Sequence, residues 1–258
     1  MSIKNSYSTE DQQGKWKVIY FSIPNRGEQL RLMFQFAKVD FIDERLDYNS
    51  NEFQALKKAS IGDASPLLYD QVPVIMSPDG KKYAQTAACM QLLGHVLPNL
   101  APEDKETDAI CLGLVIASEE LRNNCFYKIF KAEAYGYIAP KKAPICCCIG
   151  PLLRCMKGTN KHKKVFGKFA KHFDDILRLS KLKYFASDTQ VYYGDIAVFD
   201  CIHACLDLPC FNREKELKPF PSLKKWFDNM DCIPQIKKYL EERGTILEYL
   251  WRSMSKKV

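Results

Sequence analysis

A short block around residue 80 combines residue types that could bind a small anionic ligand. Val72-Pro73-Val74-Ile75 reads as the start of a strand, where proline is tolerated because no ladder donor is needed at the first residue. Asp79-Gly80 signals a tight hairpin turn, and Gln85-Thr86 stand where the next helix should begin. A helix N-terminus presents unpaired N–H groups and favours negative charge. The block therefore predicts a site where a carboxylate meets Gln85, Thr86 and the helix N-terminus.

The segment upstream has a strand, turn and helix pattern of its own. Lys17-Val18-Ile19-Tyr20-Phe21 is a β-branched and aromatic run, typical of a strand. Ser22-Ile23-Pro24-Asn25 follows as the turn, and a helix-like stretch runs from Arg26 to Phe34. The phenol of Tyr20 thus stands at the end of the first expected strand.

Both segments resemble the glutathione-binding half of the cytosolic glutathione transferases. That family usually shows x-P-V/I-L, then D-G, then Q-S at a helix N-terminus. Its tyrosine-dependent classes begin with Y-F-x-x-x-x-R-x-E-x-x-R, which this chain reproduces from Tyr20 to Arg31, with most similarity to the sigma class. The resemblance covers the first half of the chain with several motifs and the second half only by pattern.

The expected fold is an α/β N-terminal thioredoxin-like domain followed by an all-α C-terminal domain, the glutathione transferase fold. The first domain should contain strands at 17–21 and 41–46, helices at 26–38 and 52–59, and a strand, strand, helix block ending near Leu97. We expect a disordered extension at 1–14, the thioredoxin-like domain at 15–97, a linker at 98–103 and the helical domain at 104–258. In that last domain, apolar periodicity predicts helices over 108–130, 165–182, 195–208, 222–230 and 234–240.

Composition is consistent with this resemblance. A chain of 258 residues with 47% hydrophobic residues can bury the core of one large or two modest domains. It contains neither a run of eighteen apolar residues nor a signal h-region, so neither a membrane span nor secretion is indicated. The eleven cysteines are odd in number and form no C-x-x-C pair, which fits a reducing compartment better than a disulfide framework.

The resemblance implies that the thiol of glutathione must become a thiolate. A free thiol has a pKa of about 8.5, and lowering it by about two units means favouring the anion by roughly 2.7 kcal/mol. A phenol O–H aimed at the sulfur can supply much of this as a hydrogen bond to the charged form. Tyr20 stands where the tyrosine classes place that phenol. Ser22 remains the alternative, because other classes use a serine just past this strand.

The other glutathione contacts also follow from the resemblance. Gln85 and Thr86 would hold the γ-glutamyl carboxylate, with Thr86 keeping the hydroxyl of the usual serine. Lys57 would face the glycyl carboxylate, while Phe53 replaces the sigma-class tryptophan and so loses an indole N–H donor. The remaining predicted contacts are Phe21, Arg26 and the backbone at Val72 and Pro73, whose X-Pro bond can be cis.

The second half departs from the family pattern at two places. The S/T-x-A-D capping box appears as Tyr192-Tyr193-Gly194-Asp195, in which Asp195 fits but a tyrosine cannot fold back onto N3 as serine does. The acid that contacts the partner subunit's glutathione in the family aligns with Asn123, and Glu119 and Glu120 are alternatives. Three aromatic residues are candidates for lining the apolar substrate site: Phe126, Phe130 and Trp251.

A basic, cysteine-rich stretch is the least family-like part of the chain. No Asp or Glu occurs from Ala134 to Phe173, yet nine Lys and Arg do, two more than the net charge of +7 of the whole chain. An apolar segment inside it reads as an insertion near 139–162. It is interpreted as a surface loop over the substrate pocket or as a membrane-surface anchor through acylated cysteines and lysines. Metal binding by Cys148, Cys155 and His162 is not favoured, because the spacing matches no zinc template.

The sequence thus predicts a cytoplasmic, homodimeric glutathione transferase that conjugates glutathione, as substrate, to a small hydrophobic electrophile. Two alternatives stay open: a glutathione-dependent isomerase of the prostaglandin-synthase type, and a non-catalytic haem- or lipid-binding protein of the same fold. No metal is expected, and Cys201, His203 and Cys205 are interpreted as core residues. Nucleic-acid binding is not expected either, because no aromatic stacking platform accompanies the lysines.

Overall fold

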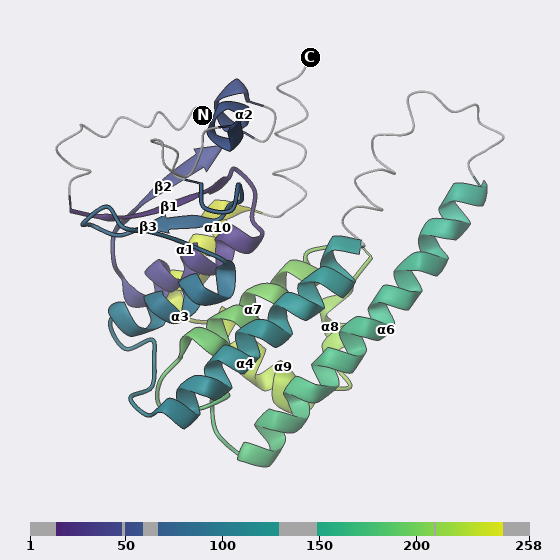
Figure 1. The fold of residues 1–258 in the computed structure, drawn as a ribbon. Coiled ribbons are helices and arrows are strands. Elements are labelled where there is room, and N and C mark those ends of the chain that lie inside the picture. Colours follow the sequence, from purple (N-terminus) through teal and green to yellow (C-terminus); the bar gives the residue numbers. More distant parts are fainter. Residues whose placement is uncertain (1–13, 48–49, 59–66, 129–148, 209, 245–258) are drawn as a thin grey trace. The chain divides into compact units, whose positions relative to one another are not determined.

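The computed structural model describes residues 14–47, 50–58, 67–128, 149–208 and 210–244 (Figure 1). The chain divides into two compact units, Met1–Leu100 and Ala101–Val258, which we call unit 1 and unit 2. The expected N-terminal extension lies outside the described residues, apart from Gly14.

Unit 1 is built on a four-stranded mixed sheet in the order β2-β1-β3-β4. The strands are β1 (Trp16–Phe21), β2 (Phe41–Leu46), β3 (Val74–Met76) and β4 (Lys82–Ala84). Strand β1 pairs in parallel with β2 and antiparallel with β3, and β3 pairs antiparallel with β4. The helices are α1 (Arg26–Ala37), α2 (Asn51–Lys58) and α3 (Thr86–Val96). This β-α-β-α-β-β-α order confirms the predicted thioredoxin-like domain.

The central strand β1 is buried on both faces. Ile19 packs in a cluster with Leu46, Phe53 and Val74 on one face. Val18 and Tyr20 alternate with it and so belong to the opposite face, as successive strand residues must. Burial on both faces is typical of a strand flanked by a parallel partner and covering helices.

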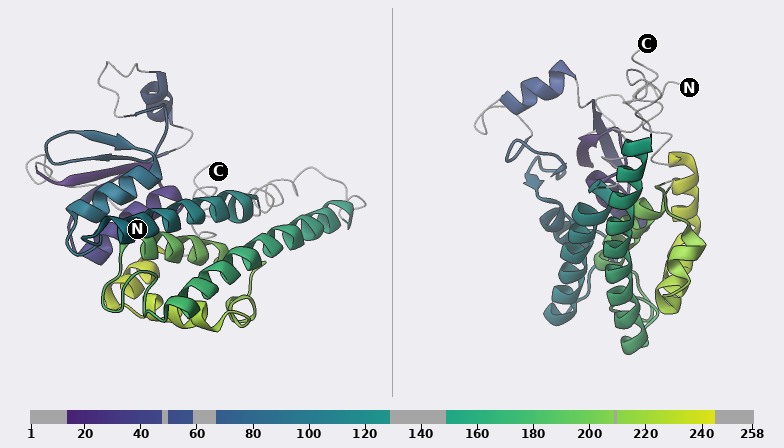
Figure 2. Two further views of the ribbon diagram at one scale, coloured as in Figure 1. Left: turned by 60° about the horizontal axis from the view of Figure 1, so that its bottom comes forward. Right: turned by 90° about the vertical axis from the view of Figure 1, so that its right-hand side faces the viewer.

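Among the described residues of unit 2, the regular secondary structure is all helical (Figures 1 and 2). Its elements are α4 (Lys105–Leu121), the π-helical turn η2 (Arg122–Phe126), α6 (Ile149–Ser180), α7 (Tyr193–Leu206), α8 (Arg213–Leu217), α9 (Pro221–Asp231) and α10 (Pro234–Arg243). Helix α7 contacts α4 and η2, and α6 contacts α9 and η2. Almost every residue of α7 is buried, so this helix forms the centre of the unit.

Two helices of unit 2 differ from the sequence prediction. Helix α6 begins at Ile149 rather than near Val165, so residues 149–162 of the expected insertion are helical. Pro151 is compatible with this start because the first helical turn needs no N–H from it. Helix α8 was not predicted, since its five residues bury only Leu217 and show no apolar period.

A buried carboxylate holds the start of α7. Asp195 accepts hydrogen bonds from the N–H groups of Phe185 (3.0 Å) and Tyr192 (3.1 Å) and from Nε1 of Trp226 (3.0 Å). Complete burial raises the pKa of Asp195 to about 6, although these three donors oppose the shift. The glycine before it is explained by packing, because a Cβ at Gly194 would lie 2.9 Å from Cα of Cys111 in α4.

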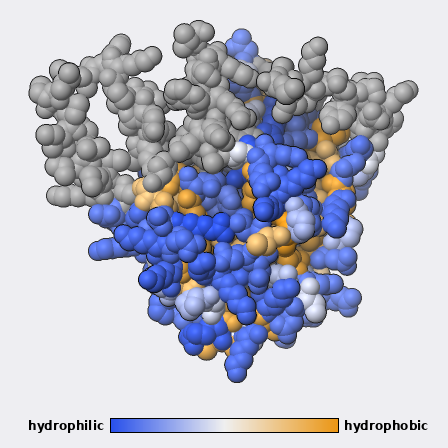
Figure 3. Space-filling model, turned by 180° about the vertical axis from the view of Figure 1, so that it is seen from behind, coloured by the Kyte–Doolittle hydropathy of each residue, from blue (hydrophilic) through white to orange (hydrophobic). Residues whose placement is uncertain are grey.

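The surface is mostly hydrophilic on the face drawn in Figure 3, where apolar residues show in separate patches. Among the described residues, no helix combines the length and the apolar character that crossing a membrane would require.

Candidate active site

Tyr20 lies at the end of β1, with only 4% of its surface exposed. Its ring is 5.3 Å from that of Phe21, measured between centroids. On the other side it packs against the first turn of α1, because a Cβ built at Gly27 would lie 2.4 Å from Cδ1 of Tyr20. The ring is therefore held in place by backbone on the α1 side.

A buried guanidinium, Arg31, fixes the turn that follows Tyr20. Its Nη2 donates to the carbonyl of Phe21 at 3.1 Å, and its Nη1 donates to the carbonyl of Ile23 at 3.2 Å. The guanidinium carbon lies 5.8 Å from the centroid of the Tyr20 ring. Arg31 thus ties the β1–α1 turn to the helix beneath it.

The charge of Arg31 is balanced by two carboxylates. Its Nε donates to Asp43 at 2.9 Å, and its Nη1 donates to Glu28 at 3.2 Å. Arg31 and Glu28 are both about 1% exposed. A buried ion is tolerated only when it is paired and hydrogen-bonded. We did not predict this role from the sequence, although the R-x-E-x-x-R spacing contains both Glu28 and Arg31.

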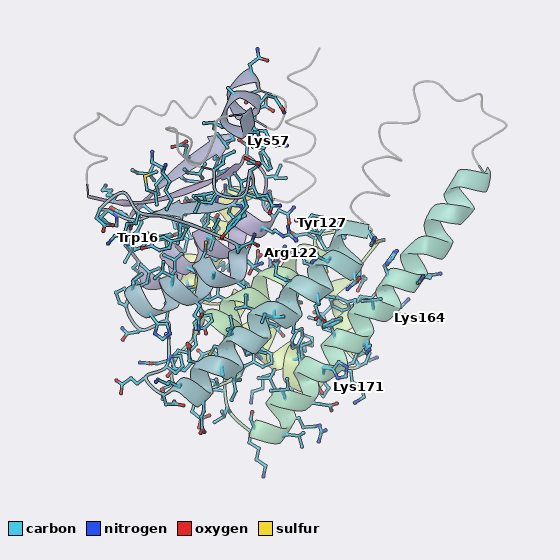
Figure 4. The ribbon with its side chains drawn as sticks, viewed as in Figure 1. Trp16, Lys57, Arg122, Tyr127, Lys164 and Lys171 are labelled. Carbon is cyan, nitrogen blue, oxygen red and sulfur yellow. The ribbon has the colours of Figure 1, made fainter. Side chains whose placement is uncertain are left out.

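Phe53 and Lys57 of α2 connect to the same region through an aromatic contact. The rings of Phe21 and Phe53 meet edge to face at 4.9 Å. Phe53 is 5% exposed and belongs to the core cluster of the sheet, against which Val72 also packs. Nζ of Lys57 lies 6.0 Å from the centroid of the Phe53 ring, and Lys57 itself is exposed (Figure 4). Phe53 is thus a packing residue, while Lys57 offers a charge to the solvent.

Gln85 caps the start of α3 by its backbone alone. Its φ of +69° lies in the left-handed region that non-glycine residues rarely occupy. Its side chain is exposed and makes no capping hydrogen bond, whereas its carbonyl accepts from the N–H of Cys89 at 2.9 Å. Thr86, the first helical residue, is buried. Strained residues of this kind are found at functional sites, and the exposed Gln85 amide is placed beside a helix N-terminus.

The remaining predicted residues of unit 1 lie at the ends of the same elements. The Val72–Pro73 peptide bond is cis and precedes β3 directly. Arg26 is the first residue of α1 and is half-buried. Ser22, the alternative to Tyr20, is exposed in the β1–α1 turn, and its N–H donates to the carbonyl of Leu46 at 3.2 Å.

The candidates for a contact with a partner subunit divide by orientation. Glu119 turns inward, with its Oε1 3.3 Å from Nε of the buried Arg122. Nη2 of Arg122 reaches Asp200 of α7 at 2.5 Å, and these two residues are at most 2% exposed. Glu120 and Asn123 are exposed, and Asn123 lies in the π-helical turn. Of the three candidates, Glu119 is the one engaged in the interior.

Other predictions for unit 2 meet different outcomes. Phe126 is 1% exposed and packs in the core of unit 2, and its role in lining a substrate site stays a prediction. Phe130 and Trp251 lie outside the described residues, as do Cys148 and the side chain of Cys155.

Cys201 and Cys205 are fully buried, which confirms their interpretation as core residues. Nδ1 of His162 lies 2.9 Å from the carbonyl of Asn124.

The described part of the chain offers few other candidate sites. It contains no group of three or more His, Cys, Asp or Glu side chains arranged to hold a metal ion. A shallow cavity of about 780 Å³ lies at α8 and α9. Its lining includes Lys215, Lys218, Lys225 and Asp228 and none of the predicted glutathione contacts.

A thioredoxin-like unit followed by an all-helical unit is the architecture of glutathione S-transferases, and comparisons with known proteins agree. A family model described as the glutathione S-transferase C-terminal domain matches residues 156–243. Glutathione S-transferase P 10 of Caenorhabditis elegans is 25% identical over 227 residues, or 88% of this chain and 91% of the relative. The chain is thus similar to glutathione S-transferases in sequence over most of its length. These matches also support the prediction of a glutathione transferase.

Solved structures agree on the fold. The structure described as prostaglandin synthase D of Nilaparvata lugens has a TM-score of 0.65 at 19% identity, covering 90% of this chain and 99% of that one. A glutathione S-transferase of the hookworm Necator americanus, described as monomeric, has a TM-score of 0.68 at 19% identity, with 89% and 98% covered. At these identities the likeness concerns the fold alone.

Proposed function

We propose that this protein is a glutathione transferase, similar to the sigma class, that conjugates the glutathione thiolate to small apolar electrophiles. The observation that carries the proposal is the position of Tyr20. A phenol stands at the end of β1, its ring packed against Gly27 and its following turn tied down by Arg31. A fixed phenol can direct its O–H at a thiolate without losing side-chain entropy on binding.

In this proposal the phenol of Tyr20 donates a hydrogen bond to the glutathione sulfur and stabilises the anion. The exposed amide of Gln85 and the hydroxyl of Thr86 would hold the γ-glutamyl carboxylate at the N-terminus of α3. Lys57 would attract the glycyl carboxylate from α2, and Arg26, Phe21, Phe53, Val72 and Pro73 would complete the glutathione surroundings. The thiolate then attacks the electrophilic carbon and forms a C–S bond. In a substitution the leaving group departs with its bonding electron pair, and in an addition the carbanion that forms takes a proton from water.

The reaction that the protein catalyses has a second candidate. The fold neighbour described as a prostaglandin synthase D supports a glutathione-dependent isomerase as the second candidate reaction. In that reaction the thiolate would add to the substrate and later be released.

We further propose a homodimer in which Glu120 or Asn123 contacts the partner's glutathione, although one fold neighbour is described as monomeric. Sedimentation at working concentrations separates a monomer from a dimer.

Steady-state turnover of glutathione with a generic aryl halide tests the function. Tyr20→Phe should lower turnover by about ten- to a hundredfold, the loss of a charge-assisted hydrogen bond of about 1.5 to 3 kcal/mol, while glutathione binding changes little. Ser22→Ala is the matched control for the other hydroxyl. A larger loss in Ser22→Ala would move the role to Ser22. The wild-type protein could instead bind glutathione and turn over neither an aryl halide nor a prostaglandin endoperoxide. That result would favour the non-catalytic haem- or lipid-binding protein.

A further inference from the structure

One face of α6 carries an uninterrupted row of lysines, spaced three or four residues apart. All four are exposed: Lys161, Lys164, Lys168 and Lys171. We call this row the α6 lysine face; Figure 4 labels Lys164 and Lys171 on the helix. The opposite side of α6 is used by the core of unit 2, through Phe166, Ala170, Phe173 and Leu177. The lysines therefore play no part in packing the helix.

Three of these lysines have no carboxylate partner among the residues that the structure describes. Lys171 pairs with Asp175 at 2.5 Å, and the neighbouring Lys163, which faces another direction, pairs with Glu216 at 3.0 Å. For Lys161, Lys164 and Lys168, no ion pair is found in the described ranges. Like charges three and four residues apart on a helix repel each other. Asp175 relieves this repulsion at Lys171, and no described acid pairs with the other three lysines of the α6 lysine face.

Some other cations of unit 2 pair with an acid on their own helix. Lys224 pairs with Asp228, and Lys238 pairs with Glu242, each four residues along its own helix. The chain, by contrast, has no acidic residue at all from Ala134 to Phe173. The separation of charge is therefore a local property of α6 and its surroundings, and it favours an anionic partner.

Two apolar side chains are exposed at the C-terminal end of the helix. Leu179 is 70% exposed and Ile176 is 40% exposed. Leu179 follows Lys168 by eleven residues, about three helical turns, and so lies on the same side. The distance along the axis from Lys161 to Leu179 is about 27 Å. A row of lysines that ends in apolar side chains matches the headgroup layer of a bilayer, which accepts both.

We propose that the α6 lysine face docks on an anionic membrane surface. The lysines would lie among phosphate and carboxylate headgroups, while Leu179 and Ile176 enter the boundary with the acyl chains. A lipid surface fits better than a nucleic acid, because the exposed apolar side chains Leu179 and Ile176 suit acyl chains, and no Phe of α6 from Lys161 onward is exposed for stacking bases. This attachment uses no residue of the candidate active site and does not depend on the proposed function.

Vesicle flotation with the full chain tests the docking. Binding is expected to vesicles of phosphatidylcholine with about 20% phosphatidylserine, to fall as salt rises from about 0.05 to 0.5 M, and to be absent with phosphatidylcholine alone. The triple variant Lys161→Glu, Lys164→Glu, Lys168→Glu should bind at least on the order of a hundredfold more weakly. The matched control changes three exposed lysines elsewhere in unit 2, Lys218→Glu, Lys225→Glu and Lys237→Glu, with the same change of charge.

The control triple should keep most of the binding, and both triples should keep wild-type glutathione turnover and helical content. Leu179→Ser should weaken vesicle binding at unchanged charge, which separates insertion from charge alone. If the two triple variants lost vesicle binding equally, the net charge of the protein and not the α6 lysine face would determine binding. The proposal would then be wrong. It would also fall if wild-type protein ignored the anionic vesicles, or if single-stranded RNA bound the face and the vesicles did not.

Discussion

The ring of Tyr20 lies directly against the backbone of Gly27. A Cβ at position 27 would approach Cβ, Cγ and Cδ1 of Tyr20 to between 2.4 and 2.7 Å, closer than real Cβ contacts allow. The contact joins the end of β1 to the first turn of α1, so the position of the candidate catalytic phenol depends on a residue with no side chain. This constraint on the position of the Tyr20 ring can be tested separately from the phenol itself.

Gly27→Ala should therefore move the Tyr20 ring. We expect the free energy of unfolding to fall by about 1 to 3 kcal/mol, as for other overpacked sites, and turnover to fall by about tenfold or more. Gly113→Ala in α4 is the control, because its Cβ would meet nothing within 4 Å and alanine favours a helix. Urea unfolding and turnover measure both effects. Unchanged turnover in Gly27→Ala would show that the phenol does not need its present position.

Gln85 permits a test in which stability and binding should change in opposite directions. Gln85→Gly relieves a non-glycine φ of +69° and should raise the free energy of unfolding by about 1 kcal/mol. It also removes the exposed amide, so glutathione affinity should fall by about tenfold. Gln85→Ala is the control that loses the amide and keeps the strain. Calorimetry showing wild-type affinity in both variants would remove Gln85 from the site.

Lys57 should contribute to glutathione binding through charge. Lys57→Ala is expected to weaken affinity several-fold and to make the remaining binding less sensitive to salt, because one screened attraction is lost. Lys15→Ala removes the same charge from an exposed position just before β1 and should leave affinity unchanged. Titrations at two ionic strengths measure the difference. Equal salt dependence in wild type and Lys57→Ala would contradict the placement of the glycyl carboxylate.

The sequence predicted those parts of the structure that depend on local pattern. The strand at 41–46 and the start of α1 at Arg26 agree with the prediction, and the turn before Arg26 is a local signal. The burial of Phe53 and Phe126 was not predicted, since an aromatic residue in a motif looks the same whether it packs or binds. Which side a residue faces is decided by contacts with distant segments.

Two further features could not have been found by pattern. The π-helical turn at Arg122–Phe126 places one extra residue in a turn of helix, so the 3.6-residue period does not give the direction of Asn123, the residue that the alignment pointed to. The pairing of Arg122 with Asp200 joins residues 78 positions apart. The role of Arg31 was missed for a different reason: its acceptors are the carbonyls of the β1–α1 turn, and carbonyls carry no sequence signal.

Asp195 should make stability depend on pH in a definite direction. Its pKa is raised from 3.8 to about 6 by burial, so the folded state binds the proton more tightly than the unfolded state does. The stability that this group contributes is complete below its unfolded pKa and is lost as the pH rises through about 6. From pH 7.5 down to 5.0, the free energy of unfolding of wild type should rise by about 1.4 kcal/mol relative to Asp195→Asn.

The comparison needs Asp195→Asn, because asparagine does not titrate. The pH-dependent contributions of all other groups then cancel in the difference between wild type and variant. The variant should be less stable at every pH, since its NH₂ group cannot accept hydrogen bonds from Phe185, Tyr192 and Trp226 together. Asp175→Asn is the control: ion pairs with Lys171 and Arg178 lower its pKa to about 2, below the range tested. Urea unfolding from pH 5.0 to 7.5 gives the difference curves. A difference in stability between wild type and Asp195→Asn that does not change with pH, or that changes in the opposite direction, would contradict this prediction. Either result would mean that the three donors outweigh burial and keep the carboxylate of Asp195 ionised in the wild type.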